Sequence, residues 1–122
     1  MSMTRGPVVL VEDDAGLREA LERVLAATGF AVCGFGSAEA ALAERATAEA
    51  RCLVLDIQLP GISGFELYER LATGDNEPAV VFITAHDLPV NHDRARQLGA
   101  IGYLIKPFSG RELAAIVAKA FA

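Results

Sequence analysis

Four apolar segments of this sequence end in side chains that are able to do chemistry: Glu12-Asp13-Asp14, Asp56, Thr84 and Lys106-Pro107. Carboxylates held close together repel one another unless a cation intervenes or one carboxyl stays protonated. A small hard cation with oxygen ligands meets this need, and Mg²⁺ commonly binds one or two carboxylates together with waters and a phosphate. These residue types therefore predict a divalent metal site, provided that the fold brings the segment ends together.

Asp56 is also a candidate nucleophile. Beside a bound cation, a carboxylate can attack a phosphoryl donor and form an acyl phosphate. The charge that develops in such a transfer is neutralised by the metal and by positioned donors. Lys106 offers a compact positive charge and Thr84 offers a hydroxyl, so the set as a whole favours phosphoryl transfer.

Each of these residues also has an ordinary structural interpretation. Asp14 would cap the following helix, and Asp56 would belong to a turn. Lys106 would be a solvated lysine and Thr84 would bond to nearby backbone. The two interpretations stay open for Asp14, whereas the joint placement of the other groups at segment ends favours the chemical one.

Hydrophobic periodicity identifies the elements that must position these residues. Five short apolar runs, at residues 7–11, 30–35, 52–55, 79–83 and 101–105, predict strands. Four of the runs lack polar alternation, which is typical of parallel strands that are covered on both faces. The run 30–35 is interrupted by Cys33 and Gly34, so it is predicted to lie at an edge of the sheet.

Helical patterns fill the gaps between the runs, at residues 17–28, 38–50, 63–72, 90–98 and 112–121. Ser63 with Glu66, and Ser109 with Glu112, predict capping boxes at two of the helix starts. The apolar stripe of residues 90–98 is thin. We therefore expect this helix to pack lightly and to move most.

Strict alternation of strand and helix predicts an α/β fold with one doubly wound sheet of five parallel strands and five helices. Ligands of such sheets bind at the carboxyl ends of the strands. The four groups of reactive side chains stand at those ends, so the predicted fold would collect them on one rim.

Length, composition and charge exclude several classes of protein. A chain of 122 residues that is 52% hydrophobic forms one domain rather than a disordered segment. The net charge of −5 and the lack of a basic run argue against direct nucleic-acid binding. No apolar run is long enough to span a membrane and no signal peptide begins the chain, so a cytoplasmic location is expected. Cys33 and Cys52 fit neither a disulfide framework nor a metal clip.

Residues 9–14, 53–64, 83–85 and 103–108 read VLVEDD, LVLDIQLPGISG, ITA and YLIKPF. Together these motifs resemble the receiver domain of two-component response regulators, and the resemblance covers essentially the whole chain. It implies a flavodoxin-like sheet with strand order 2-1-3-4-5 and a receiver domain over residues 7–122. Residues 1–6 would form an N-terminal extension, in which Met1-Ser2-Met3 is consistent with an expression remnant.

The resemblance implies a Mg²⁺ cofactor and a role for each acidic residue. Asp56 would be the phosphoacceptor. Asp13 and Asp56 would bind Mg²⁺ directly, the Gln58 backbone carbonyl would be a further ligand, and Glu12 would act through a water. Glu12 replaces the aspartate that is more frequent in the family, and its longer side chain is expected to reach a metal-bound water still.

The resemblance also implies which residues respond to phosphorylation. Thr84 and Lys106 would hold the phosphoryl oxygens, and the peptide bond between Lys106 and Pro107 would be cis. Tyr103 would be the switch aromatic that turns inward when Thr84 is drawn to the phosphate.

Gln58 and His86 follow Asp56 and Thr84 by two residues, at positions where the family varies. They would flank the path of an attacking water. We therefore expect them to tune the lifetime of the phosphorylated state, in a direction that the sequence leaves open.

The function that the resemblance implies is a phosphorylation switch rather than an enzyme. A sensor histidine kinase or a histidine phosphotransfer protein would supply the phosphoryl group, and the chain would catalyse only its own phosphorylation and dephosphorylation. The surface formed by the fourth helix, fifth strand and fifth helix would then change, to control an output or a partner. Its helices are also candidates for a phosphorylation-dependent homodimer. Whether the chain is a stand-alone regulator, a fragment or the receiver of a hybrid kinase stays open.

Three alternatives are weighed against this interpretation. A Mg²⁺-dependent phosphohydrolase with an aspartyl nucleophile usually has a second acid two residues later, where this chain has Gln58. A receiver-like binding module that takes no phosphate would not need Asp56, Thr84 and Lys106 together. A flavodoxin-like scaffold with incidental rim charges leaves their joint placement unexplained.

Overall fold

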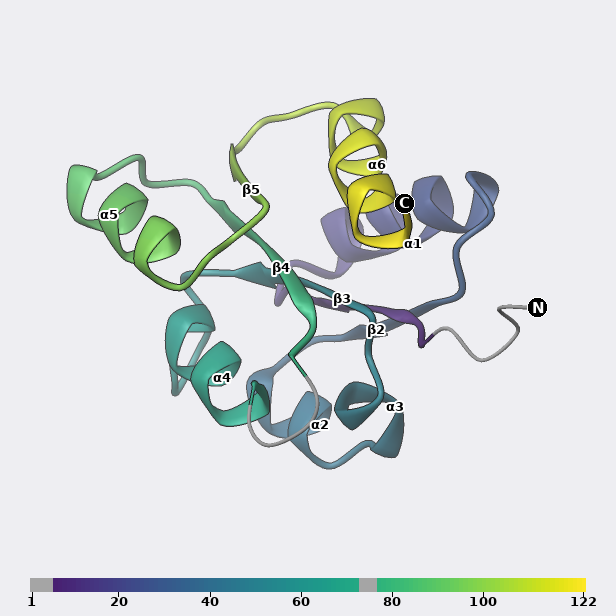
Figure 1. Ribbon diagram of the computed structural model, residues 1–122, viewed down its shortest axis with the longest axis horizontal. Coiled ribbons are helices and arrows are strands. Elements are labelled where there is room, and N and C mark those ends of the chain that lie inside the picture. The colour runs from purple at the N-terminus through teal and green to yellow at the C-terminus, as the bar shows by residue number, and fades with distance from the viewer. Residues whose placement is uncertain (1–5, 73–76) are drawn as a thin grey trace.

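A five-stranded parallel sheet forms the centre of the computed structural model, which describes residues 6–72 and 77–122. The strands are β1 (Val8–Val11), β2 (Val32–Phe35), β3 (Cys52–Asp56), β4 (Ala79–Thr84) and β5 (Gly102–Ile105). They pair in the order β2-β1-β3-β4-β5, which confirms the predicted topology (Figure 1). All strands run parallel, so their carboxyl ends share one edge of the sheet.

The helices are α1 (Ala15–Ala27), α2 (Ala38–Leu42), α3 (Arg45–Ala48), α4 (Gly64–Leu71), α5 (Pro89–Gln97) and α6 (Gly110–Ala118). A short 3₁₀ turn, η1 (Lys119–Phe121), follows α6. Helices α1 and α6 cover one face of the sheet, and α2 to α5 lie on the other (Figure 1). The longest described helix has 13 residues, and no described helix is long and apolar enough to cross a membrane.

Two hydrophobic cores lie on the two faces of the sheet. Leu10 and Val54 pack with Leu21, Leu25 and Leu113 on the face of α1 and α6. On the opposite face, Val9 and Leu53 pack with Phe82, Leu67 and Ala95. Because successive strand residues point to opposite faces, both cores need apolar residues, which explains the unbroken apolar runs.

Strand β2 lies at an edge, as its interrupted run predicts. It pairs with β1 alone, and all of its residues are partly exposed, whereas all residues of β1 are buried. An edge strand needs less apolar surface, so it tolerates Cys33 and Gly34.

The prediction of one helix over residues 38–50 is wrong, because this segment forms two short helices, α2 and α3. Ala38, Ala41, Thr47 and Ala50 are all buried. In a continuous helix, at about 100° per residue, Thr47 and Ala50 would lie roughly 120–180° around the axis from Ala38. The break after α2 turns both residues toward the core instead.

The two predicted capping boxes have different outcomes. Ser109 and Glu112 form the complete box at the start of α6. At α4, the Ser63 hydroxyl accepts a hydrogen bond from the Glu66 N–H, but the Glu66 carboxylate bonds to Arg70 at 3.1 Å. The prediction of a full box at Ser63 is therefore wrong in its second half, since an arginine one turn later competes for the carboxylate.

Helix α5 is anchored weakly, as its thin apolar stripe predicts. Its buried residues are Asn91 and Ala95, and no side chain caps its start at Leu88. Leu88 and Val90 are exposed hydrophobic residues at this end of the helix. That α5 moves most stays a prediction.

Gly64 lies where α4 approaches the end of β3 most closely. A Cβ at this position would be 2.3 Å from the carbonyl oxygen of Asp56, a backbone atom that cannot swing aside. The Gly64 N–H donates to the Ile57 carbonyl at 3.0 Å. Glycine here therefore lets α4 support the loop that follows Asp56.

We predict that Gly64→Ala lowers the free energy of unfolding by about 1–3 kcal/mol, because the added methyl group overpacks this contact. Urea denaturation followed by circular dichroism measures the change. Gly16→Ala is the matched control: Gly16 is an exposed residue of α1, the nearest atom to an added Cβ is 3.5 Å away, and alanine favours the helix. Equal stability of the Gly64→Ala and wild-type proteins would contradict the close-approach argument.

Candidate functional site

Three carboxylates meet at the carboxyl edge of the sheet. Glu12 and Asp13 follow β1, and Asp56 ends β3, the neighbouring strand. One oxygen of each lies within 4.8 Å of the others. Glu12 and Asp56 are buried, whereas Asp13 is exposed. A donor set made only of oxygens fits a hard divalent cation such as Mg²⁺.

Lys106 joins the carboxylates from the other side. It follows β5, and its Nζ lies 2.8 Å from Glu12 Oε1 and 2.8 Å from Asp56 Oδ2. One ammonium faces two buried carboxylates and Asp13 nearby, so the cluster keeps an excess of negative charge when all groups are ionised. A divalent cation would neutralise that excess.

The loop after β3 fixes the Asp56 carboxylate. Gln58 N–H donates to Asp56 Oδ1 at 2.8 Å, and Lys106 Nζ donates to Oδ2 at the same distance. Ile57 N–H continues the ladder to the Ile83 carbonyl of β4 at 2.9 Å. Both carboxylate oxygens are therefore held by donors from different segments, which orients the group with little freedom.

The first strand is connected to the site through Glu12 and its neighbours. Glu12 Oε2 accepts from the Asp14 N–H at 3.0 Å, and its backbone carbonyl accepts from Arg18 Nη1 at 2.8 Å. Asp14 caps α1 by accepting from the Leu17 N–H at 3.0 Å, which confirms its capping interpretation. Sequence reasoning missed Arg18, and no pattern in the sequence distinguishes it from other surface arginines.

Thr84 ends β4 with a fully buried side chain. Its hydroxyl donates to the Gln58 Oε1 atom at 2.7 Å and accepts from the His86 N–H at 2.9 Å. The His86 carbonyl, 3.1 Å away, is a second acceptor for the same proton. Gln58 and His86 are both exposed residues of the loops that flank the carboxylates.

Tyr103 on β5 packs against α5. Its ring stacks on that of His92 with centroids 4.0 Å apart, and His92 Nε2 lies 2.6 Å from Asp87 Oδ1. The Tyr103 hydroxyl is enclosed without a hydrogen-bond partner within bonding distance. Burial raises the pKa of Tyr103, the Asp87 charge raises it further, and Asn91 opposes them. The sequence does not predict this contact, because nothing in the local pattern pairs His92 with Tyr103.

The remaining predicted residue, Pro107, is exposed and follows Lys106 through a cis peptide bond. The structure therefore brings Glu12, Asp13, Asp56 and Lys106 together, with Gln58 bridging to Thr84. The side chains that the sequence places at the strand ends therefore lie close together at one edge of the sheet.

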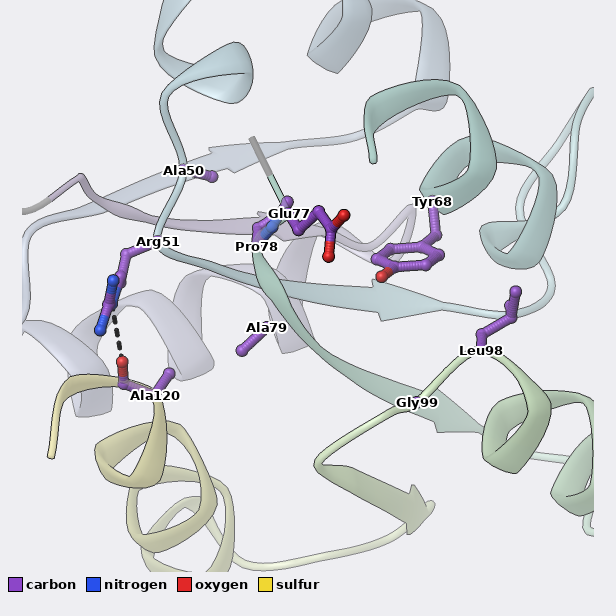
Figure 2. A pocket seen from close by; sticks show the side chains of 9 residues that line it. All are labelled: Ala50, Arg51, Tyr68, Glu77, Pro78, Ala79, Leu98, Gly99 and Ala120. Carbon is purple, nitrogen blue, oxygen red and sulfur yellow. Dashed lines mark hydrogen bonds between the residues drawn. The ribbon is translucent and has the colours of Figure 1, made fainter. Parts of the chain in front are cut away.

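A hollow of about 470 Å³ opens at the edge of the sheet opposite the carboxylate cluster (Figure 2). Here Arg51 Nε donates to the Ala120 carbonyl at 2.8 Å and fastens the end of the chain to the start of β3. Glu77 lies beside the Tyr68 ring; burial raises the pKa of Tyr68, and the Glu77 charge adds to the effect. None of the residues predicted for the site lines this hollow.

The fold raises the pKa of the Glu12 carboxyl toward neutral pH. Burial raises its pKa to about 7, the Lys106 hydrogen bond and the Asp14 N–H oppose the rise, and the Asp56 charge adds to it. Burial alone would lower the pKa of Lys106, but the bonds and charges of Asp56 and Glu12 outweigh it and raise the pKa.

A carboxyl with a higher pKa in the folded state binds its proton more tightly when folded. The contribution of Glu12 to the free energy of unfolding therefore falls as pH rises from 4.5 to about 7. Glutamine cannot ionise. Without metal, we therefore predict that the free energy of unfolding of Glu12→Gln rises relative to that of wild type by on the order of 2 kcal/mol across this pH interval. Urea denaturation at a series of pH values, in the presence of a chelator, measures this difference in stability. Glu19→Gln, at an exposed position of α1, is the control. A difference that does not vary with pH would contradict the assignment.

Comparison with known proteins identifies the family. The response regulator receiver domain matches residues 8–118. Nodulation protein W of Bradyrhizobium diazoefficiens is 39% identical over 111 residues, which are 90% of this chain and 48% of that protein. The transcriptional regulatory protein FixJ of the same organism is 33% identical over 118 residues, or 96% of this chain and 57% of that protein. The chain thus spans about half the length of these curated relatives.

Solved structures agree with the sequence comparison. The non-phosphorylated HemR receiver domain from Leptospira biflexa superposes with a TM-score of 0.85 at 27% identity, covering 96% of this chain and 94% of that one. The BeF3-activated receiver domain of DrrB, from Thermotoga maritima, gives 0.82 at 27% identity, covering 93% and 95%. With this fold, these strand-end residues and a family match over nearly all of its length, the chain belongs to the receiver domains of two-component response regulators.

Proposed function

We propose that the chain accepts a phosphoryl group on Asp56, with Mg²⁺ bound, and switches its surface in response. The observation that carries the proposal is the environment of the Asp56 carboxylate. Lys106 and the Gln58 N–H hold its two oxygens, and the Glu12 and Asp13 oxygens lie beside it. An oriented nucleophile beside a divalent-cation site is what phosphoryl transfer to a carboxylate requires.

Four residues would hold the cation. Asp13 and Asp56 would bind it directly, the Gln58 backbone carbonyl would be a further ligand, and Glu12 would act through a water. When bound, Mg²⁺ supplies positive charge that neutralises the phosphoryl oxygens during transfer. Burial raises the pKa of Glu12, and a cation bound nearby would oppose this effect and favour the ionised carboxylate.

The donor would be a phosphohistidine of a sensor histidine kinase or of a histidine phosphotransfer protein. An Asp56 oxygen attacks the phosphorus, a P–O bond forms, and the P–N bond breaks with its electron pair passing to the imidazole. Lys106, already 2.8 Å from Asp56 Oδ2, would pair with a phosphoryl oxygen. Hydrolysis of the acyl phosphate would return Asp56 and inorganic phosphate, so the chain would catalyse only its own phosphorylation and dephosphorylation.

Phosphorylation would then reach the surface of α5, β5 and α6. The Thr84 hydroxyl would turn to a phosphoryl oxygen and carry with it the backbone of His86, to which it is bonded. Asn91 of α5 donates to the His86 carbonyl at 3.0 Å, and His92 of α5 stacks on Tyr103. A movement of the loop after β4 would therefore be transmitted both to α5 and to Tyr103, whose turning marks the switch.

The changed surface would control an output segment or partner, and its helices would support a phosphorylation-dependent homodimer. Gln58 and His86, beside the path of an attacking water, would tune how long the phosphoryl group survives. The net charge of −5 supports control through protein contacts rather than direct nucleic-acid binding by this chain.

Incubation with acetyl phosphate and Mg²⁺ tests the proposal. We predict a mass gain of one phosphoryl group by intact-protein mass spectrometry, its loss when Mg²⁺ is chelated, and its absence in Asp56→Asn. Asp93→Asn, an exposed aspartate of α5, is the matched control and should be labelled like wild type. Equal labelling of Asp56→Asn and wild type would contradict the assignment of Asp56.

A further inference from the structure

The side chain of Gln58 occupies the acceptor position for the Thr84 hydroxyl proton. Gln58 Oε1 lies 2.7 Å from Thr84 Oγ1, across 26 residues of sequence. The backbone N–H of the same glutamine donates to Asp56 Oδ1 at 2.8 Å. One residue therefore contacts both the proposed phosphoacceptor, through its backbone, and the proposed responding hydroxyl, through its side chain.

A hydroxyl has one proton to donate. While Thr84 donates it to Gln58, the proton cannot be donated to a phosphoryl oxygen on Asp56. Thr84 also accepts from the His86 N–H, so its oxygen is held on two sides. The Thr84 hydroxyl therefore cannot donate a hydrogen bond to Gln58 and to a phosphoryl oxygen at the same time.

We infer that Gln58 is a positioning residue that holds Thr84 in the resting position and competes with the phosphoryl group for its hydroxyl. The inference rests on the proposed function and adds to it a role for the Gln58 side chain in the unphosphorylated state. This role acts through Thr84 and is separate from any effect on the water that attacks the acyl phosphate.

Loss of the Gln58 acceptor leaves Thr84 with another partner. The His86 carbonyl lies 3.1 Å from Thr84 Oγ1 and can accept the proton. Gln58 itself is exposed, so its substitution does not disturb the core. Removal of the acceptor should therefore preserve the fold and change only the rest position of the hydroxyl.

The expected change in affinity for a phosphoryl mimic follows from the net free energy of one hydrogen bond. Replacing the 2.7 Å bond to Gln58 by the longer 3.1 Å bond to the His86 carbonyl leaves the hydroxyl less firmly held. The binding of beryllofluoride, a phosphoryl mimic, should therefore tighten by about two- to tenfold in the presence of Mg²⁺. Gln58→Met keeps the length of the side chain but removes the acceptor. Gln97→Met, at the exposed end of α5, is the matched control.

The first measurement uses the resting protein without Mg²⁺ or phosphate. In two-dimensional NMR spectra, Gln58→Met should shift the His86 amide and Thr84 methyl signals, whereas Gln97→Met should leave them in place. Unchanged His86 and Thr84 signals in Gln58→Met would overturn the inference, and this holds whether or not the chain can be phosphorylated.

The second measurement is a double-mutant cycle of beryllofluoride affinity in wild type, Gln58→Met, Thr84→Val and the double variant. The tightening by Gln58→Met should occur with Thr84 present and vanish with Val at this position. An equal gain in both backgrounds, or no gain in either, would overturn the inference, because Gln58 would then act independently of Thr84 or not at all. Failure of wild type to bind beryllofluoride would instead overturn the proposed function on which the inference rests.

Discussion

The site depends on one ammonium group held between two buried carboxylates. Lys106 Nζ lies 2.8 Å from both Glu12 Oε1 and Asp56 Oδ2, and the three residues stand at the carboxyl ends of three strands, β5, β1 and β3. Without this cation, two carboxylates would share a buried space, which costs free energy or forces one of them to stay protonated. Burial raises the pKa of Glu12 to about 7, and the hydrogen bond from Lys106 opposes this rise only in part. The remaining negative charge makes the cluster a candidate site for a divalent cation.

The parallel sheet makes this arrangement achievable. Because β1, β3 and β5 all end at the same edge, residues that are 50 apart in sequence, Asp56 and Lys106, meet without a special loop. Strands β1 and β3 are buried along their whole length, and Gly64 allows α4 to pack directly against the backbone of Asp56. By contrast, the weakly anchored α5 lies beside the loop that follows Thr84. The fold thus combines an Asp56 carboxylate held by two donors with a lightly anchored helix α5.

The sequence predicts the sheet and the meeting of the side chains at the strand ends, because both follow from strong local signals. Unbroken apolar runs such as Val8–Val11 occur where both faces are covered, and the residues after those runs must meet in a parallel sheet. The break between α2 and α3 could not be predicted from composition, since helix propensity is favourable throughout and only the core decides which way Thr47 and Ala50 must face. The Gln58–Thr84 bond and the His92–Tyr103 stack also escape sequence reasoning, because each joins loop or surface residues whose types fit many environments.

We propose that Asp56 accepts the phosphoryl group within the cluster formed by Glu12, Asp13 and Lys106. A crystal structure of the wild-type chain with Mg²⁺ and beryllofluoride would decide this. We expect beryllium bound to an Asp56 oxygen, with Lys106 Nζ and Thr84 Oγ1 on its fluorides and Mg²⁺ among the acidic side chains. Beryllofluoride bound elsewhere, or absent from Asp56 while Mg²⁺ occupies the cluster, would rule out Asp56 as the phosphoacceptor.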